Sequence, residues 1–254
     1  MSWYDPVDSD KHYWHRYSSF YQRHFAALGA ASSILEYGIL QGASIGWLHR
    51  VFPQAEIFGV DIEPQQPGWP TGPGITYLKA DQGDRRNIAC MLQRLNRTFD
   101  LVIEDGSHVP AHQANCLAET FPYLRPGGLY VLEDLHAAHP QHSLYRTHCA
   151  AGTPDSLHLL LLIEHRRAAD QALRAGDAER LSRTGVFTQA DVVRLAHMIA
   201  EIDIFHRATL PLRCFSCGTD DFDFVALRCQ CGVDLDILGA DSMTAVLRRG
   251  TAPG

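Results

Sequence analysis

Five short apolar runs recur along the first half of this chain, and most of them end in, or next to, an acidic residue. The runs are Ser33–Tyr37, Glu56–Asp61, Ile75–Lys79, Phe99–Glu104 and Leu129–Glu133. Each run has the length of a strand, and helical spacing or Pro/Gly-rich loops separate them. Strands that alternate with helices form a parallel sheet with helices on both faces. The pattern therefore predicts an α/β fold with a doubly wound sheet.

The sequence pattern also divides the chain into three parts. Residues 1–31 form an aromatic-rich helical segment, with a helix from Ser18 to Ala31, that either packs on the domain or covers a substrate cleft. Residues 32–213 form the α/β domain, and residues 214–254 form a tail with four cysteines. The expected further elements of the domain are helices at Ser44–Val51, Arg85–Leu95, Ala111–Tyr123, Leu157–Ala175 and Thr188–Ile199, and a strand at Glu201–Leu212.

Composition excludes several classes of protein. The chain has 254 residues, 46% of them hydrophobic, and a net charge of −7, which suits a globular protein with a sizeable core and argues against a nucleic-acid partner. No basic helix indicates a membrane surface, the start has no signal-peptide pattern, and the longest apolar run, Leu157–Ile163, is too short to cross a bilayer. We expect a cytoplasmic protein, in which seven cysteines are thiols or metal ligands.

The loop after the first run indicates the cofactor. It reads Glu36-Tyr37-Gly38-Ile39-Leu40-Gln41-Gly42 and leads into a helix for which Ser44 is a suitable cap. A dinucleotide site would instead have G-x-G-x-x-G with a pyrophosphate at the helix start. A leading carboxylate is better suited to the ammonium group of S-adenosylmethionine. Asp61 is positioned for a ribose diol, and Asp81 and Gln82 for an adenine edge.

A second group of acids follows two later runs. Glu104, Asp105 and His108 come after one run, and Glu133 and Asp134 end the next. Because the carboxyl ends of parallel strands lie along one edge of the sheet, Asp105, Glu133 and Asp134 should be close together. A bound cation would remove their repulsion, and hard oxygen ligands favour Mg²⁺ or Mn²⁺. His108 would then lie beside the metal, where a neutral imidazole can act as the general base.

At these residues the chain resembles the metal-dependent sugar O-methyltransferases of antibiotic biosynthesis, the mycinamicin, macrocin and rhamnosyl type. The matching stretches cover roughly residues 10–136, and they are Asp10-Lys11-His12 with Tyr17 and Tyr21, then ILEYGILQGASIGWL, FPQAEIFGVDI, ADQGD, FDLVIEDGSH and PYLRPGGLYVLEDLH. Two departures stand out, because Tyr37 replaces a small or aliphatic residue and Glu104 replaces an aspartate. The cysteine tail has no counterpart in the pattern of the family.

The resemblance implies the Rossmann-like fold of class I S-adenosylmethionine methyltransferases. It also implies that Asp105, Glu133 and Asp134 hold Mg²⁺, that His108 is the catalytic base, and that the cofactor site is lined by Glu36, Gly38, Asp61, Asp81, Gln82 and Glu104. The expected reaction is methylation of a deoxysugar hydroxyl, on a nucleotide sugar or a glycosylated natural product. We expect a small-molecule partner, neither nucleic acid nor membrane, and leave a homo-oligomer open.

Three other functions remain open from the sequence. A methyltransferase of a catechol or another phenol would use similar metal chemistry. A dinucleotide-dependent oxidoreductase is disfavoured by the missing G-x-G-x-x-G. A non-catalytic ligand-binding protein on the same fold would have no use for His108 beside Asp105.

The tail contains Cys214-x-x-Cys217 and Cys229-x-Cys231, which together could form a four-thiolate structural zinc site. The C-x-C half is tighter than the usual C-x₂-C spacing. Buried or surface thiols are the alternative interpretation. The histidines of residues 136–148 are expected to be polar residues of a substrate loop.

Overall fold

The structure is a computed structural model that describes residues 8–235 and 242–251. The first seven residues of the expected N-terminal segment, and positions 236–241 and 252–254 of the expected tail, lie outside the described residues. None of the described helices is long and apolar enough to cross a membrane.

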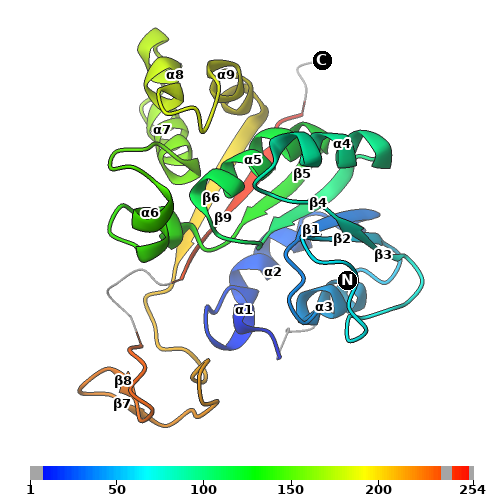
Figure 1. Ribbon diagram of the computed structural model, residues 1–254, viewed down its shortest axis with the longest axis vertical. Helices are drawn as coiled ribbons and strands as arrows, with labels where there is room; N and C mark the ends of the chain where they lie inside the picture. The colour runs from blue at the N-terminus through cyan, green and yellow to red at the C-terminus, as the bar shows by residue number, and fades with distance from the viewer. Residues whose placement is uncertain (1–7, 236–241, 252–254) are drawn as a thin grey trace.

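A seven-stranded sheet forms the centre of the molecule, in the order β3-β2-β1-β4-β5-β9-β6 (Figure 1). Its strands are β1 (Ser33–Tyr37), β2 (Glu56–Asp61), β3 (Ile75–Lys79), β4 (Phe99–Glu104), β5 (Leu124–Leu132), β6 (Ile199–His206) and β9 (Met243–Arg249). The first five are parallel, and β9 runs antiparallel to both β5 and β6. The predicted doubly wound α/β sheet is therefore confirmed.

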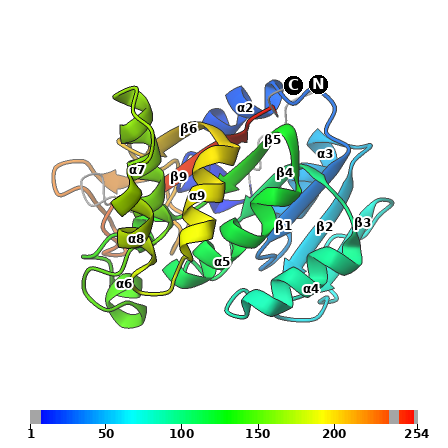
Figure 2. The same cartoon turned by 90° about the horizontal axis from the view of Figure 1, so that it is seen from above.

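Helices cover both faces of the sheet (Figure 2). On one face, α2 (Ser18–Ala26) and α3 (Ala43–Val51) pack their apolar side chains on β1, β2 and β4. On the other face lie α4 (Arg85–Leu95), α5 (Pro110–Thr120), α7 (Ser156–Ala168), α8 (Ala175–Ser182) and α9 (Gln189–Met198). The strands are apolar on both sides because each side meets a helical layer.

Several expected boundaries were wrong. The predicted helix Leu157–Ala175 ends at Ala168, and Asp170 then adopts a left-handed φ of 53° before α8 begins. The predicted strand Glu201–Leu212 is β6, which ends at His206. β5 begins at Leu124, five residues before the expected start, because Leu124 already pairs with Phe99. The cap of α3 is Gly42, with a φ of 79°, and not Ser44.

The expected tail from residue 214 is not a single segment. Its last part returns to the sheet as β9, between β5 and β6. The cysteine-bearing part leaves the sheet after β6, and its described residues form only the two-residue strands β7 (Phe222–Asp223) and β8 (Arg228–Cys229). It projects from the body of the molecule on the side of the short helices α1 (Asp10–Tyr13) and α6 (Ser143–His148) (Figure 1).

Candidate active site

A cavity of about 710 Å³ opens at the carboxyl edge of the parallel strands. The strand ends and the loops that follow them supply most of its wall, as the rule for open α/β sheets predicts. Eight of the predicted site residues line it, namely Gly38, Asp61, Asp81, Gln82, Asp105, His108, Glu133 and Asp134. Residues almost a hundred positions apart in the sequence, from Gly38 to Asp134, therefore line the same cavity.

The loop after β1 has a backbone that only glycine permits at its first position. Gly38 has a φ of 84°, and a Cβ there would collide with the backbone carbonyl of Asp105. The next residue, Ile39, donates its backbone N–H to the Asp61 carboxylate at 2.9 Å. Asp61 therefore holds the loop in place and also faces the cavity.

The structure places Glu36 and Glu104 behind the cavity wall. Both are fully buried at the ends of β1 and β4 and neither lines the cavity. Burial raises the pKa of Glu36 to about 7, against the opposing effects of Lys11 and the nearby Ser44 hydroxyl. Burial likewise raises the pKa of Glu104 to about 7. Their predicted contact with a cofactor stays a prediction.

Gln82 is held by the protein itself. Its amide nitrogen donates to Glu104 at 2.7 Å, and its amide oxygen accepts the backbone N–H of Ser107 at 3.1 Å. A Cβ at Gly106 would overlap this amide, so any other residue there would displace the Gln82 side chain. Gln82 therefore joins the loops after β3 and β4, and its predicted contact with adenine remains a prediction.

The acids of the predicted metal site lie together, and a lysine lies among them. Lys11 of α1 is buried, and its ammonium group bonds Asp105 as well as Glu133, the latter at 2.9 Å. Burial alone would lower the pKa of Lys11, but the two carboxylates raise it well above its usual value. The ammonium group is therefore charged, and it neutralises part of the acidic cluster.

One ammonium group does not balance three carboxylates. Burial and mutual repulsion raise the pKa of Asp105 and of Glu133 despite the presence of Lys11. Ligand atoms of Asp105, His108 and Asp134 lie within 4.8 Å of one another, so a cation held by the carboxylates would lie beside the His108 imidazole. The donor set and the excess negative charge fit a divalent cation with oxygen ligands.

His108 lies beside these acids, as predicted. Its Nε2 atom is 3.5 Å from an Asp134 carboxylate oxygen and 3.9 Å from one of Asp105. Burial would lower the pKa of His108, but the negative charges of Asp134 and Asp105 outweigh it and raise this pKa. Its Nδ1 atom makes no hydrogen bond of normal geometry within the described part of the chain.

Asp134 is the most strongly acidic member of the cluster. Burial alone would raise its pKa, but the imidazoles of His15, His108 and His136 and the Tyr17 hydroxyl lower it to about 2. The Tyr17 hydroxyl donates to Asp134 at 3.0 Å. Asp134 is thus held as a carboxylate by groups from both the N-terminal segment and the loop after β5.

The N-terminal segment has two roles in the structure. In α2 the side chains of Phe20, Tyr21 and Phe25 are buried in the core, as expected for a helix that packs on the domain. By contrast, α1 and the residues beside it form part of the cavity wall through Asp8–Lys11, Tyr13 and His15.

Sequence reasoning assigned no role to Lys11, although a signal was present. Lysine occurs only at positions 11 and 79, whereas the other basic residues are arginines. A lysine retained in such a chain, between acids and aromatic residues, indicates a specific requirement for an ammonium group. Trp69 was also missed. It lines the cavity from the loop after β2 and donates its indole N–H to the Leu40 carbonyl at 2.9 Å.

The comparisons with known proteins concern the family and the fold. Residues 35–135 match a family model described as a methyltransferase domain. The MycE methyltransferase of the mycinamycin pathway, solved in complex with Mg and SAH, superimposes with a TM-score of 0.62 at 20% identity, over 98% of this chain and 55% of that one. The chain thus has the predicted fold of class I S-adenosylmethionine methyltransferases, and its residues 35–135 are similar to a methyltransferase domain.

The sequence relatives narrow the resemblance to sugar O-methyltransferases. An 8-demethyl-8-α-L-rhamnosyl tetracenomycin-C 2′-O-methyltransferase of Streptomyces olivaceus is 33% identical over 139 residues, which are 52% of this chain and 36% of that protein. The mycinamicin VI 2″-O-methyltransferase of Micromonospora griseorubida is 35% identical over 136 residues, 49% of this chain and 33% of that protein. The predicted resemblance to this type is confirmed, although the chain spans only about a third of the length of these relatives.

Proposed function

We propose that this protein is an S-adenosylmethionine- and Mg²⁺-dependent O-methyltransferase that methylates a hydroxyl of a deoxysugar, either nucleotide-activated or on a glycosylated natural product. One observation carries the proposal. Asp105, His108 and Asp134 converge at the cavity into which the glycine loop and Asp61 also open. A cofactor site, a cation site and a base therefore share one space.

Support for the cofactor comes from the loop after β1. The close approach of Gly38 to the loop after β4 leaves the backbone open to the cavity, and the Asp61 carboxylate has oxygen lone pairs beyond those used by Ile39 and Glu63. A carboxylate in that position can accept hydrogen bonds from a ribose diol. We assign Gly38, Asp61 and Asp81 to the cofactor, and Asp105, Glu133 and Asp134 to the cation.

In the proposed reaction, the bound cofactor and cation supply part of the chemistry and the residues of the protein supply the rest. S-adenosylmethionine supplies an electrophilic methyl group, and a divalent cation lowers the pKa of a chelated hydroxyl. His108 is placed to take the proton of that hydroxyl at Nε2, and Asp134 and Asp105 stabilise the imidazolium that results. Transfer of the methyl group to that oxygen would break the bond between the methyl carbon and sulfur and would leave the cofactor as a thioether.

The relatives favour a sugar as the acceptor. The names of the two aligned proteins describe methylation of a sugar hydroxyl or of mycinamicin VI, and neither describes a free phenol. Tyr13 and His15 add an aromatic and a polar side chain to the wall of the cavity. Carbohydrate rings pack on aromatic faces and bond to polar side chains, so this wall is suitable for a glycosylated acceptor.

Calorimetry with S-adenosylhomocysteine, followed by methyl-transfer assays, tests the proposal. We expect binding of the thioether, transfer to a nucleotide deoxysugar or a deoxysugar glycoside, and loss of turnover in EDTA that Mg²⁺ or Mn²⁺ restores. Asp61→Ala should weaken cofactor binding by about 1–3 kcal/mol. Methyl transfer to catechol but to no sugar would contradict the proposed acceptor. Full activity in EDTA would contradict the proposed requirement for a metal.

A further inference from the structure

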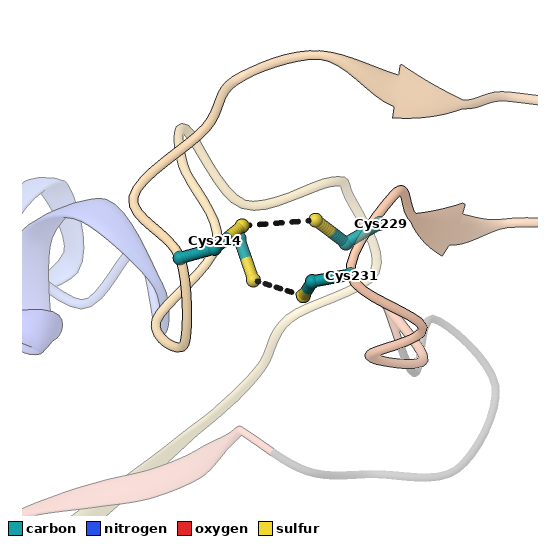
Figure 3. Close-up of side chains that lie close together, drawn as sticks. Cys214, Cys229 and Cys231 are labelled. Carbon is teal, nitrogen blue, oxygen red and sulfur yellow. Dashed lines mark hydrogen bonds between the residues drawn. The ribbon is translucent and has the colours of Figure 1, made fainter.

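The four cysteines of the segment after β6 converge on one point, although they come from two separate turns (Figure 3). The sulfur atoms of Cys214 and Cys231 are 3.7 Å apart, and those of Cys217 and Cys229 are 3.4 Å apart. All four lie within 4.8 Å of one another. Tetrahedral zinc with Zn–S bonds of about 2.3 Å has its sulfurs about 3.8 Å apart. Disulfide sulfurs would be only about 2.05 Å apart.

The two turns that carry the cysteines share a glycine and a hydrogen bond. In each, a glycine with positive φ follows the second cysteine, Gly218 at 75° and Gly232 at 90°. Each glycine donates its N–H to the carbonyl of the first cysteine of its pair, at 2.9 Å for Cys214 and 2.8 Å for Cys229. The turn residues therefore point both sulfurs of a pair to the same side.

Little else would hold this segment together. Its strands β7 and β8 have two residues each, and among the described residues its apolar cluster has five buried members, Trp14, Cys214, Phe222, Cys229 and Leu235, with Tyr13, Leu210 and Val233 partly buried against them. Phe215, Phe224 and Val225 are exposed. A segment with so small a core usually needs a disulfide or a metal ion to keep one conformation.

We propose that Cys214, Cys217, Cys229 and Cys231 bind one zinc ion as thiolates, and that this zinc-bound segment, residues 212–235, supports α1 at the cavity. Each thiol loses its proton as it binds, and four thiolates favour zinc over the hard cation of the acidic cluster. The site is separate from the proposed methyl transfer, and its existence does not depend on that function.

The contacts with α1 give the zinc-bound segment its second role. Trp14, at the end of α1, belongs to the cysteine cluster, and its ring lies 4.7 Å from that of Phe215. The backbone N–H of Leu212 donates to the Tyr13 carbonyl at 2.6 Å. Because Lys11 and Tyr13 line the cavity, a change in the segment would be transmitted to the active-site wall.

Metal analysis of the full chain, purified under reducing conditions without chelators, tests the zinc site. We expect about one zinc per chain. Cys217→Ser and Cys231→Ser should lose it, whereas Cys90→Ser, which alters an exposed thiol on α4, should keep it. If the variants do not fold, cobalt substitution of the wild-type chain still tests the four-thiolate site, because four thiolates give Co²⁺ an intense charge-transfer absorption.

Hydrogen exchange with and without a strong chelator tests the support of α1. Removal of zinc should speed exchange in residues 9–17 and 212–235 and leave β1 and β4 unchanged. Absence of zinc from the reduced protein, two disulfides among these four cysteines, or equal zinc loss in Cys90→Ser would overturn the site. Unchanged exchange in residues 9–17 after verified zinc removal would overturn the role of the segment at the cavity.

Discussion

His108 and Asp134 both have a left-handed backbone, with φ values of 56° and 54°. Residues other than glycine rarely adopt this conformation, and where they do they often lie at functional sites. Here the strained backbone turns both side chains toward the cavity, where His108 Nε2 lies 3.5 Å from Asp134. At the scale of single residues, local strain and charge clustering therefore coincide at the positions assigned to catalysis.

His108→Ala should leave the fold and the binding of S-adenosylhomocysteine intact and lower turnover by about 10²- to 10⁴-fold, because a general base contributes that much. Single-turnover rates and calorimetry on the same preparation measure the two effects. His139→Ala is the matched control, since His139 is exposed and lies outside the cavity wall. Full activity of His108→Ala would show that another group, such as His136, removes the proton.

Lys11→Met should destabilise the metal-free protein by about 3–5 kcal/mol, because it leaves Asp105 and Glu133 buried without their cation. Mg²⁺ should restore part of the loss, so the variant should gain more stability from Mg²⁺ than the wild type does. Urea unfolding with and without Mg²⁺ measures both quantities. Lys79→Met, which changes the other lysine at an exposed position, is the control. Equal stabilities of the two variants without metal would contradict the role of Lys11.

At the scale of elements, one ion-pair network joins the helices of one face. Arg85, at the start of α4, bonds Asp191 of α9 through two nitrogens, each at 2.7 Å, and also bonds Glu119 of α5. Asp191 also accepts from the Thr188 hydroxyl and forms the capping box of α9. These contacts hold α9 in place before β6, so they fix where the chain re-enters the sheet.

Asp191→Asn should lower the free energy of unfolding by about 1.5–3 kcal/mol, the range for hydrogen bonds to charged groups. The loss arises because Asn retains only one acceptor oxygen for Arg85 and carries no charge. Thermal or urea unfolding measures it. Glu179→Gln on α8 should change stability by less than about 0.5 kcal/mol, because Glu179 is exposed and its partner Arg183 is 4.0 Å away. Similar losses in both variants would contradict this account of α9.

At the scale of the whole molecule, residues 15–21 and 242–244 meet beside the active site, although they are far apart in the sequence. The Tyr21 hydroxyl of α2 bonds Thr244 of β9 at 2.9 Å, and His15 bonds Ser242 at the same distance. The N-terminal segment and the start of the last strand are therefore joined beside the acidic cluster. The carboxylates at the strand ends are buried as a result, and the stability of the fold must depend on pH.

Glu36 provides the test of that dependence. Its pKa is raised from 4.5 to about 7 by burial, so the folded state holds a proton that the unfolded state has already lost between these values. The free energy of unfolding should therefore fall as pH rises from about 4.5 to about 7 and level off above it. Below about 4.5 both states are protonated, and the residue contributes no pH dependence.

Glu36→Gln stays neutral at every pH and should lack this fall. In the cofactor-free protein its stability relative to wild type should rise by up to about 3 kcal/mol between about pH 5 and pH 8. Urea unfolding at both pH values measures the difference. A pH-independent difference for Glu36→Gln would contradict the raised pKa.

The sequence alone determined those features of this protein that depend on residues close together in the chain. The bounds of β1 to β4 follow from short apolar runs that end at polar residues, and the observed bounds match those predicted. The placement of Asp105, His108, Glu133 and Asp134 at one edge followed as well, because parallel strands all present their carboxyl ends there. The fold class and most of the site were therefore predictable.

Only the tertiary structure decided what depends on residues distant in sequence. The β9 strand, Met243–Arg249, was not predicted from its sequence, and its position is decided by β5 and β6, which supply hydrogen bonds on both sides. Lys11 lies 94 positions from Asp105, so no local pattern shows that its ammonium group sits in the acidic cluster. Such contacts form only after the layers have packed, because burial removes the water that would otherwise separate these charges.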